Sequence, residues 1–297
     1  MSTATEQGYF TEENSAEVVI SRNSRAENER LKEIMASLTR HLHAFVKDVE
    51  PTREEWMTAI QFLTRTGHLC SEWRQEFILL SDVLGVSMLV ETINSRHPSG
   101  TTEETVLGPF HVADAPHRQN GDNVCLDGKG EPMVVTGRVT DTEGRPIAGA
   151  LLDVWAANDE GFYDVQQKGV QPDMNLRGIF TADQDGRYWF RSVKPRFYPI
   201  PDDGTVGQLL KALGRHPNRP AHIHYIVGAK GYDPITTHIF VPDDPYLHSD
   251  AVFGVKESLV VDFTLNHDAG KAKALGTTAP FWEAECNFVL ARRGETG

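Results

Sequence analysis

The sequence predicts a mixed fold in which an antiparallel β-sandwich follows an N-terminal α-helical domain. Between residues 24 and 94, apolar side chains recur at steps of three and four, which is typical of amphipathic helices. After Pro98-Ser99-Gly100, short β-rich runs are separated by Gly, Pro and Asp. Many short strands with few helices between them favour an antiparallel sandwich. We therefore expect a flexible arm over residues 1–20, a helical domain over 21–100 and the sandwich domain over 101–297.

The helical domain is expected to contain three helices. Ser24 and Glu27 form a candidate capping box for the first helix, and Pro51 ends it. Thr52 and Glu55 have the same spacing and are expected to cap the second. The apolar positions are Leu31, Ile34, Leu38, Leu42, Phe45 and Val49 in the first helix, Trp56, Ile60 and Leu63 on the inner face of the second, and Trp73, Phe77, Leu80 and Leu84 in the third, which runs from Ser71 to about Ile93.

Six runs of the second half are predicted to be strands, because they are rich in β-branched and aromatic residues. A segment rich in Gly and Pro, residues 141–149, forms the turn between the first two runs. The candidate strands are Met133–Thr140, Ala150–Ala157, Arg187–Val193, His222–Val227, Ile235–Val241 and Ser258–Leu265.

The composition excludes several classes of partner. The chain has 297 residues and a net charge of −13, which argues against binding to nucleic acid or to anionic lipid. No apolar run approaches the roughly 20 residues of a membrane-spanning helix, and the first ten residues lack the features of a signal peptide. Three widely spaced cysteines indicate neither a disulfide framework nor a thiolate metal site. We expect a cytoplasmic protein.

Two His-x-His motifs differ in the geometry that their surroundings predict. His41 and His43 lie in a helical stretch, where residues two apart point in nearly opposite directions. His222 and His224 lie in a predicted strand, where residues two apart share a face. Two neutral imidazoles placed in this way can bind one metal ion. They can equally be two polar residues on a solvated face, and the spacing alone leaves both interpretations open.

Three further residues bear on that choice. Tyr163 ends the segment 153–163, a predicted strand that runs into a turn, Tyr198 lies in the proline-rich segment 194–201, and Arg219 precedes His222 by three residues. Singly, each tyrosine is more often a packing residue, and Arg219 is more often a solvated charge. Together, Tyr163, Tyr198 and Arg219-Pro-Ala-His-Ile-His224 resemble the signature of the intradiol ring-cleaving dioxygenases, and the resemblance covers about residues 25–290.

The resemblance implies a chemistry for these residues. Tyr163, Tyr198, His222 and His224 would bind one non-haem Fe(3+) per subunit. Phenolate oxygen suits a hard trivalent ion, which readily deprotonates a phenol. In such enzymes an aromatic diol binds the metal as a dianion, O2 is the second substrate, and both oxygen atoms enter the ring-opened product. Tyr198 would be the axial ligand that leaves and takes a substrate proton. Arg219 would stabilise negative charge on the ring.

The substrate preference depends on residues around the metal. Where catechol 1,2-dioxygenases typically carry a glutamine, this chain has His238. The segments 106–110, 198–201 and 253–259 resemble hydroxyquinol 1,2-dioxygenases, although Leu107 replaces a frequent Phe. Asp82 is a candidate to bind the third hydroxyl of 1,2,4-trihydroxybenzene, or it serves the helical fold. The pocket residues implied by the match are Leu79, Asp82, Val106, Leu107, Gly108, Pro109, Phe110, Ile200, Pro201, Arg219 and His238.

The expected function is therefore ring cleavage of hydroxyquinol to 3-hydroxy-cis,cis-muconate or maleylacetate in aromatic catabolism. A catechol or substituted-catechol 1,2-dioxygenase is the alternative within the family. A zinc hydratase or hydrolase with ligands His222, His224 and His238 would leave both tyrosines and Arg219 without a role. A non-enzymatic β-sandwich binding module is the other alternative. The resemblance also implies a homodimer formed through the helical domain, with phospholipid bound between the subunits.

Overall fold

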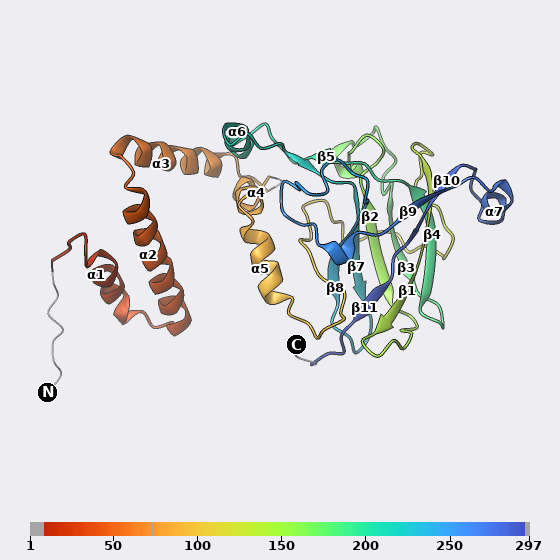
Figure 1. Ribbon diagram of the computed structural model, residues 1–297, viewed down its shortest axis with the longest axis horizontal. Helices are drawn as coiled ribbons and strands as arrows, with labels where there is room; N and C mark the ends of the chain where they lie inside the picture. The colour runs from red at the N-terminus through yellow and green to blue at the C-terminus, as the bar shows by residue number, and fades with distance from the viewer. Residues whose placement is uncertain (1–8, 73, 295–297) are drawn as a thin grey trace. The chain divides into compact units, whose positions relative to one another are not determined.

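The computed structural model describes residues 9–72 and 74–294 (Figure 1). Residues 1–8 of the expected arm and Trp73 of the expected third helix lie outside the described residues. The chain divides into two compact units, Met1–Arg65 and Thr66–Gly297.

The first unit contains helices α1 (Ser15–Arg22), η1 (Asn23–Arg25), α2 (Glu29–Val49) and most of α3 (Arg53–His68). Residues 15–20, part of the expected arm, are therefore helical. The prediction that Ser24 and Glu27 cap the first long helix is wrong, because residues 23–25 form a separate 3₁₀ turn. Asn28 caps α2 instead, and its side chain accepts a hydrogen bond of 3.0 Å from the amide of Leu31.

The predicted start of the second helix is confirmed. The amide of Thr52 donates to the Glu55 carboxylate at 2.8 Å, and the amide of Glu55 donates back to the Thr52 hydroxyl at 3.2 Å. This reciprocal pair is a capping box. The apolar positions expected on the inner face of α3 are exposed in the single chain, as are those of α2. Exposed positions of the two helices include Leu31, Ile34, Leu38, Leu42, Phe45, Val49, Trp56, Ile60 and Leu63.

The second unit begins with two helices, α4 (Glu76–Val83) and α5 (Val86–Asn94), where we expected one. Gly85 separates them with a φ of 73°, a left-handed conformation that ends an α-helix and that glycine adopts without strain. The expectation of one continuous helix to Ile93 is therefore wrong at this glycine.

Two sheets and a short ribbon follow. One sheet has the order β11-β1-β10-β9 with β4 also paired to β1, the other has the order β3-β2-β7-β8, and β5 pairs with β6. The strands are β1 (Pro132–Asp141), β2 (Leu151–Ala156), β3 (Arg177–Thr181), β4 (Arg187–Val193), β5 (Tyr198–Pro199), β6 (Asn218–Arg219), β7 (His222–Gly228), β8 (Ile235–Phe240), β9 (Phe263–Asn266), β10 (Phe281–Glu285) and β11 (Phe288–Leu290), and the remaining helices are η2 (Asp164–Gln166), α6 (Thr205–Ala212), η3 (Glu257–Leu259) and α7 (Ala269–Ala274).

The prediction of a purely antiparallel arrangement is wrong for the first sheet. β1 pairs in parallel with both β10 and β11, because the C-terminal segment returns alongside β1 in the same direction. The predicted strand Ser258–Leu265 is also partly wrong, since residues 257–259 form η3 and the strand β9 begins only at Phe263.

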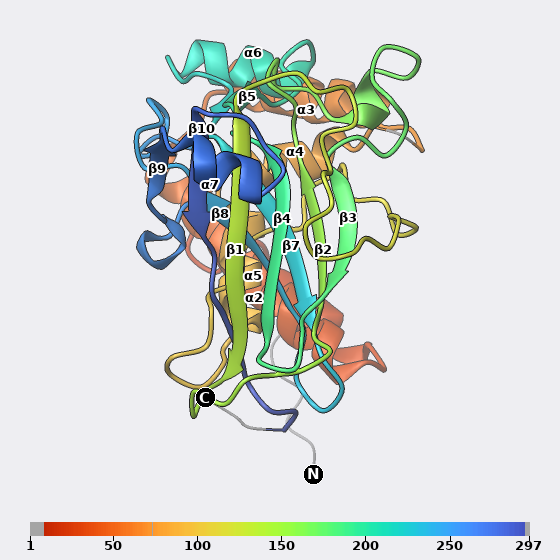
Figure 2. The same ribbon diagram turned by 90° about the vertical axis from the view of Figure 1, so that its right-hand side faces the viewer.

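The main core lies between the two sheets, which run side by side in Figure 2. Val135, Tyr188 and Phe288 of the first sheet share a buried cluster with Phe180 and Tyr225 of the second. This is a sandwich-like arrangement of two packed layers. β7 and β8 are neighbours at one edge of the second sheet, and both carry buried histidines.

Candidate metal centre

The histidines of β7 share one face of the strand, as the sequence predicts. His222 and His224 are buried, with exposed fractions of 2% and 1%, so the alternative of two polar residues on a solvated face is wrong. His238 of β8 lies directly opposite His224 in the antiparallel register. One ring nitrogen from each of the three histidines lies within 4.8 Å of the other two, close enough for a shared metal ion.

The two tyrosines reach the same point from different loops. Tyr163 follows β2 and precedes η2, and its amide donates to the Gln166 side chain at 2.9 Å. Tyr198 begins β5, opposite Arg219 of β6. The Tyr163 hydroxyl lies 2.9 Å from Nε2 of His224 and donates to the Tyr198 hydroxyl at 3.3 Å. We call Tyr163, Tyr198, His222 and His224 the tyrosine–histidine cluster.

The protonation of this cluster favours a metal ion. Nδ1 of His222 donates to the Pro220 carbonyl at 2.7 Å. Burial, together with the nearby Arg219, lowers the pKa of His222 to about 3 and holds the ring neutral. Its Nε2 therefore presents a lone pair, 3.1 Å from Nε2 of His224. The pKa of His224 is also lowered, chiefly by burial. Two neutral imidazoles that aim nitrogen atoms at one point suit a shared cation.

The phenols fit the same cation. Burial raises the pKa of Tyr163 well above its ordinary value, and the adjacent Tyr198 raises it further. A buried phenolate without a partner is costly, but a bound cation reverses that balance. Two phenol oxygens and two imidazole nitrogens thus form a donor set suited to a hard, highly charged metal ion.

Aromatic packing fixes the orientation of these donors. The indole of Trp155 stacks on His224 with ring centroids 4.6 Å apart, and Phe110 stacks on Tyr163 at 4.7 Å. Gly108 has a φ of 77°, and a Cβ atom placed there would lie 3.1 Å from Cε1 of His224. Of the expected pocket residues, Gly108, Phe110, Arg219 and His238 therefore lie against the tyrosine–histidine cluster.

A buried arginine completes the surroundings of the cluster. Arg219 lies 3.4 Å from Nε2 of His222 through Nη1 and 3.4 Å from Nδ1 of His238 through Nη2. It forms an ion pair with Asp250, and both side chains are buried. Although burial alone would lower the pKa of Arg219, Asp250 raises it, so the guanidinium remains charged.

The other expected pocket residues lie on three segments of the second unit. Asp82 and Leu79 lie on α4, and Ile200 follows β5. Ile200 packs in a cluster with Val83 and Val252, against which Leu79 also packs. Burial raises the pKa of Asp82, against the lowering effects of Ser87 and Arg219. Val106 is half-buried, and Leu107, Pro109 and Pro201 are exposed.

The structure also reveals residues that the sequence reasoning missed. Trp155 pairs with His224 across β2 and β7, a relation visible only when the strand register is known. Asp164, next to Tyr163, accepts a 2.6 Å hydrogen bond from the buried Arg177. Asp250 follows β8 by ten residues, in a loop whose return to Arg219 no local pattern indicates.

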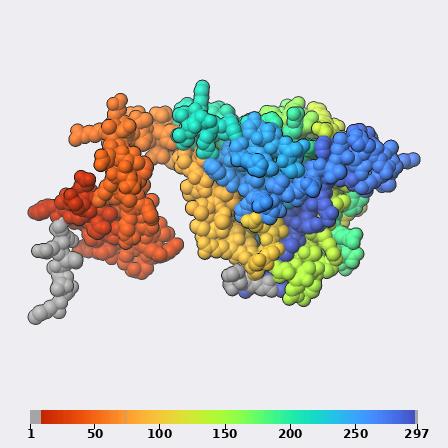
Figure 3. Space-filling model, viewed as in Figure 1, coloured from red at the N-terminus to blue at the C-terminus, as the bar shows by residue number. Residues whose placement is uncertain are grey.

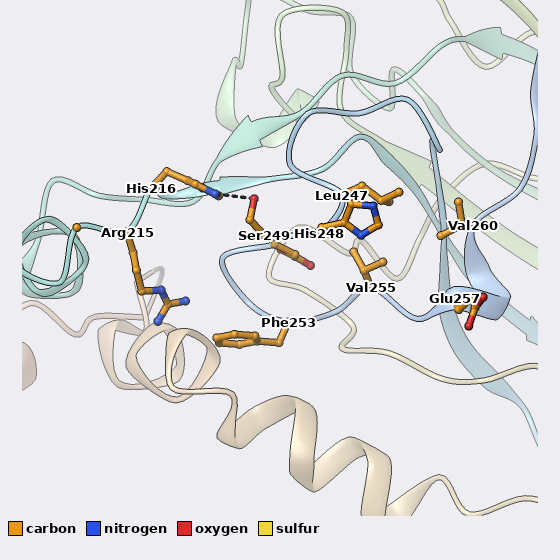
Figure 4. A pocket seen from close by; sticks show the side chains of 11 residues that line it. Arg215, His216, Leu247, His248, Ser249, Phe253, Val255, Glu257 and Val260 are labelled. Atoms are coloured by element: carbon orange, nitrogen blue, oxygen red, sulfur yellow. Dashed lines mark hydrogen bonds between the residues drawn. The ribbon is translucent and has the colours of Figure 1, made fainter.

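Asp250 also lines a hollow of about 830 Å³. Figure 4 shows the hollow with other residues that line it, among them His216, Ser249 and Phe253. In Figure 3 the teal segment of α6 and the blue segment after β8 lie next to each other on the surface. His216 reaches across to Ser249 at 2.9 Å, and Arg215 lies over the ring of Phe253. No residue of the tyrosine–histidine cluster lines this hollow.

Comparison with known proteins identifies the family. The family model described as "Dioxygenase" matches residues 106–291, and the model "Catechol dioxygenase N terminus" matches residues 28–102. The chain belongs to the intradiol dioxygenase family. It is therefore an oxidoreductase of a family whose members are iron-dependent and act in the catabolism of aromatic compounds. This assignment overturns the alternative of a non-enzymatic binding module.

Individual relatives match over most of their length. The chain is 65% identical over 293 residues to hydroxyquinol 1,2-dioxygenase of Rhizobium sp. (strain MTP-10005), covering 98% of this chain and 99% of the relative. It is 50% identical over 259 residues to 6-chlorohydroxyquinol 1,2-dioxygenase of Cupriavidus pinatubonensis, covering 87% and 94%.

Solved structures show the same dioxygenase fold. The crystal structure of hydroxyquinol 1,2-dioxygenase from Pseudomonas putida DLL-E4 matches with a TM-score of 0.90 at 47% identity, covering 95% of this chain and 99% of that one. Catechol 1,2-dioxygenase of Acinetobacter radioresistens matches with a TM-score of 0.83 at 30% identity, covering 97% and 95%. Among the described residues, no helix is long and apolar enough to cross a membrane.

Proposed function

We propose that this dioxygenase uses Fe(III) to cleave hydroxyquinol between adjacent hydroxylated carbons, giving 3-hydroxy-cis,cis-muconate or maleylacetate. The observation that carries the proposal is the convergence of two phenol oxygens and two imidazole nitrogens in one buried cluster, with contacts of 2.9 to 3.3 Å. The names of the relatives at 65% and 50% identity support hydroxyquinol or its chlorinated form as the substrate.

Tyr163, Tyr198, His222 and His224 would hold one iron per subunit. Ferric iron bound there would act as a Lewis acid, which would lower the pKa of both diol hydroxyls and draw electron density from the ring. The zinc alternative with His222, His224 and His238 leaves both phenols unused.

The two tyrosines have different surroundings, which suit different roles. Tyr163 is packed against Phe110 and is buried to 1% exposure, so it is held in place. Tyr198 is also buried, at 4% exposure, but it belongs to a ribbon with only two residues in each strand. We assign Tyr198 a general-base role, in which its phenol oxygen would accept a proton from the substrate hydroxyl.

Arg219 is assigned to the negative charge that develops on the substrate. Its guanidinium is buried and charged, and it contacts His222 and His238 on the cluster side. A fixed cation in a water-poor site stabilises charge at no reorganisation cost during the reaction.

The substrate ring is assigned to the space between the cluster and α4. Leu79 and Ile200 supply apolar wall, and Asp82 supplies a carboxyl group whose pKa is raised by burial. Catechol has no third hydroxyl, so it would leave the Asp82 carboxyl group without that partner. The site should therefore bind catechol less favourably than hydroxyquinol. The other residues assigned to the pocket are Val106, Leu107, Gly108, Pro109, Phe110, Pro201 and His238.

The deciding experiment compares ring-opened product from hydroxyquinol and from catechol with iron-loaded protein in air. Hydroxyquinol oxidises spontaneously, so product is followed by chromatography against a protein-free blank. A higher kcat/KM for hydroxyquinol supports the proposal, and Asp82→Asn should then narrow the preference. A preference for catechol would favour the catechol 1,2-dioxygenase alternative, and no ring opening of either diol would contradict the assigned activity.

Intradiol dioxygenases are generally homodimers, and we assign the dimer contact to residues 21–100. The exposed apolar side chains of α2, among them Leu38 at 47% and Leu42 at 53%, support this assignment because such a surface is costly in water. Phospholipid between the subunits and a cytoplasmic location remain predictions. Light scattering tests the dimer, and lipid extraction followed by mass spectrometry tests the bound phospholipid.

A further inference from the structure

Asp250 holds the arginine of the site through both of its carboxylate oxygens. Nε of Arg219 donates to Oδ1 at 3.2 Å, and Nη2 donates to Oδ2 at 3.3 Å. The two side chains are 2% and 4% exposed, so the pair is almost free of water. Paired contacts of this kind fix the plane of a guanidinium as well as its position.

The same carboxylate also organises a loop. The amide of Val252 donates to Oδ1 at 3.2 Å, and the amide of Gly254 donates to Oδ2 at 2.9 Å. Val252 packs in the apolar cluster that contains Ile200, a residue assigned to the substrate pocket. Asp250 therefore connects the charged group above the cluster to one wall of the pocket.

Gly254 closes the remaining side of the guanidinium. A Cβ atom at this position would lie 2.9 Å from Nη2 of Arg219 and 3.1 Å from Oδ2 of Asp250. A distance under about 3.0 Å forces a shift of the neighbouring atoms. The absence of a side chain at Gly254 thus leaves room for the contact between Nη2 of Arg219 and Oδ2 of Asp250.

The remaining polar contacts of Arg219 are too long to hold it alone. Its contacts with His222 and His238 are both 3.4 Å, at the outer limit of a hydrogen bond, and both rings are neutral. Without Asp250, a buried cation would also lack its counter-charge, which is strongly destabilising.

We propose that Asp250 is a positioning residue, which fixes Arg219 for charge stabilisation and couples it to the Val252 wall of the pocket. This proposal rests on the proposed function, because it assigns a partner to the arginine that acts in ring cleavage.

Asp250→Asn is the test variant, because an amide keeps the size of the side chain but can no longer accept at both ends. Asp141 offers a matched control. Its carboxylate also binds an arginine, Arg145, at 2.8 Å and accepts two loop amides at 3.0 Å each, yet its partners are not residues of the site. Both variants are measured for iron content, visible absorption, melting temperature, kcat and KM.

The expected result separates positioning from folding. Both variants should melt at lower temperature, bind one iron and keep the wild-type visible band, but only Asp250→Asn should lose kcat, by about tenfold to a hundredfold. A kcat for Asp250→Asn within twofold of the Asp141→Asn control would overturn the proposal.

A double-mutant cycle tests whether the effect passes through Arg219. Asp250→Asn should cause little further loss of kcat in an Arg219→Ala background, and additive losses would overturn the proposal. If Asp250→Asn does not fold, Gly254→Ala decides, because the added methyl group would press on the contact between Nη2 of Arg219 and Oδ2 of Asp250 while the charge of Asp250 is kept. A tenfold loss of kcat with iron retained supports the proposal, and a wild-type kcat overturns it.

Failure of the proposed function has a different signature. In that case the wild-type protein itself forms no ring-opened product from either diol, whatever the variants do.

Discussion

Trp155 lies flat against the imidazole of His224, with ring centroids 4.6 Å apart and ring planes 11° apart. The indole is fully buried, and the two residues are directly opposite each other in β2 and β7. A stacked ring restricts rotation of the imidazole about its bond to Cβ, and it keeps Nε2 aimed at the tyrosine–histidine cluster.

Replacement of Trp155 should therefore weaken metal binding as well as folding. We expect Trp155→Ala to lower the free energy of unfolding by about 3–5 kcal/mol, since it opens a cavity in the core. Iron content after dialysis should also fall. Trp155→Phe keeps a stacked ring and should retain most of its iron. Equal iron content in the two variants would contradict a role for the stack.

Gly108 provides a test of how closely the chain approaches His224. Its φ is 77°, and an added Cβ atom would lie 3.1 Å from the imidazole. Gly144 has a nearly identical φ of 78° and nothing within 4 Å of the corresponding position. Gly108→Ala and Gly144→Ala should each cost about 1–2 kcal/mol of stability through backbone strain.

Only Gly108→Ala should shift the visible absorption of the iron-loaded protein, because only that methyl group presses on a proposed ligand. The absorption spectrum of each variant at full iron loading provides the measurement. A spectral shift of the same size in Gly144→Ala would show that the strain, and not the contact, is responsible.

The pair of Asp141 with Arg145 should make folding stability dependent on pH. Burial alone would raise the pKa of Asp141, but hydrogen bonds from Arg145, from two loop amides and from Arg292 lower it to about 2. The ordinary value is about 3.9. Since the folded-state pKa is the lower one, the stabilisation is complete above about pH 5 and is lost as the pH falls towards 2.

Urea unfolding of the wild-type protein and of Asp141→Asn between pH 7 and pH 3 provides the measurement. The wild-type protein should be more stable at pH 7, and the difference should narrow as the pH falls below about 4. A difference that stays constant across this range would show that the charge of Asp141 contributes nothing.

Removal of the metal should destabilise the protein and abolish ring cleavage. A ligand that binds only the folded state stabilises it by about 2.7 kcal/mol when present at 100 times its dissociation constant. Chelation should therefore lower the melting temperature, and Fe(III) should restore both stability and product formation. Zn(II) should restore at most the stability. Product formation with zinc would contradict the assignment of ferric iron.

Local patterns in the sequence predicted the elements that carry the site. Alternation along residues 222–227 placed His222 and His224 on one face of a strand, and Thr52 with Glu55 marked a helix start that the structure confirms. The gathering of both tyrosines at these histidines came only from the family resemblance, because no local rule connects Tyr163 to β7.

Other features depend on contacts between distant segments. The parallel pairing of β1 with β10 and β11 requires a long return of the chain, which local periodicity does not encode. Asp250 was missed for the same reason, because its role depends on the ion pair with Arg219, which lies 31 positions earlier in the chain. The helix break at Gly85 was also missed, because one glycine inside a helical pattern is compatible with either a continuous helix or a break.

The ribbon of β5 and β6 has a consequence for the variation of such enzymes. Tyr198 and Arg219 are partners in one backbone ladder, so the spacing between the proposed proton acceptor and the cation depends on two hydrogen-bonded residue pairs. Residues 200–217, including α6, form the connection between β5 and β6. Insertions or deletions within this connection can reshape the border of the pocket while the pairing of β5 with β6 preserves the distance between Tyr198 and Arg219. Substrate range can therefore change without a change in the reaction.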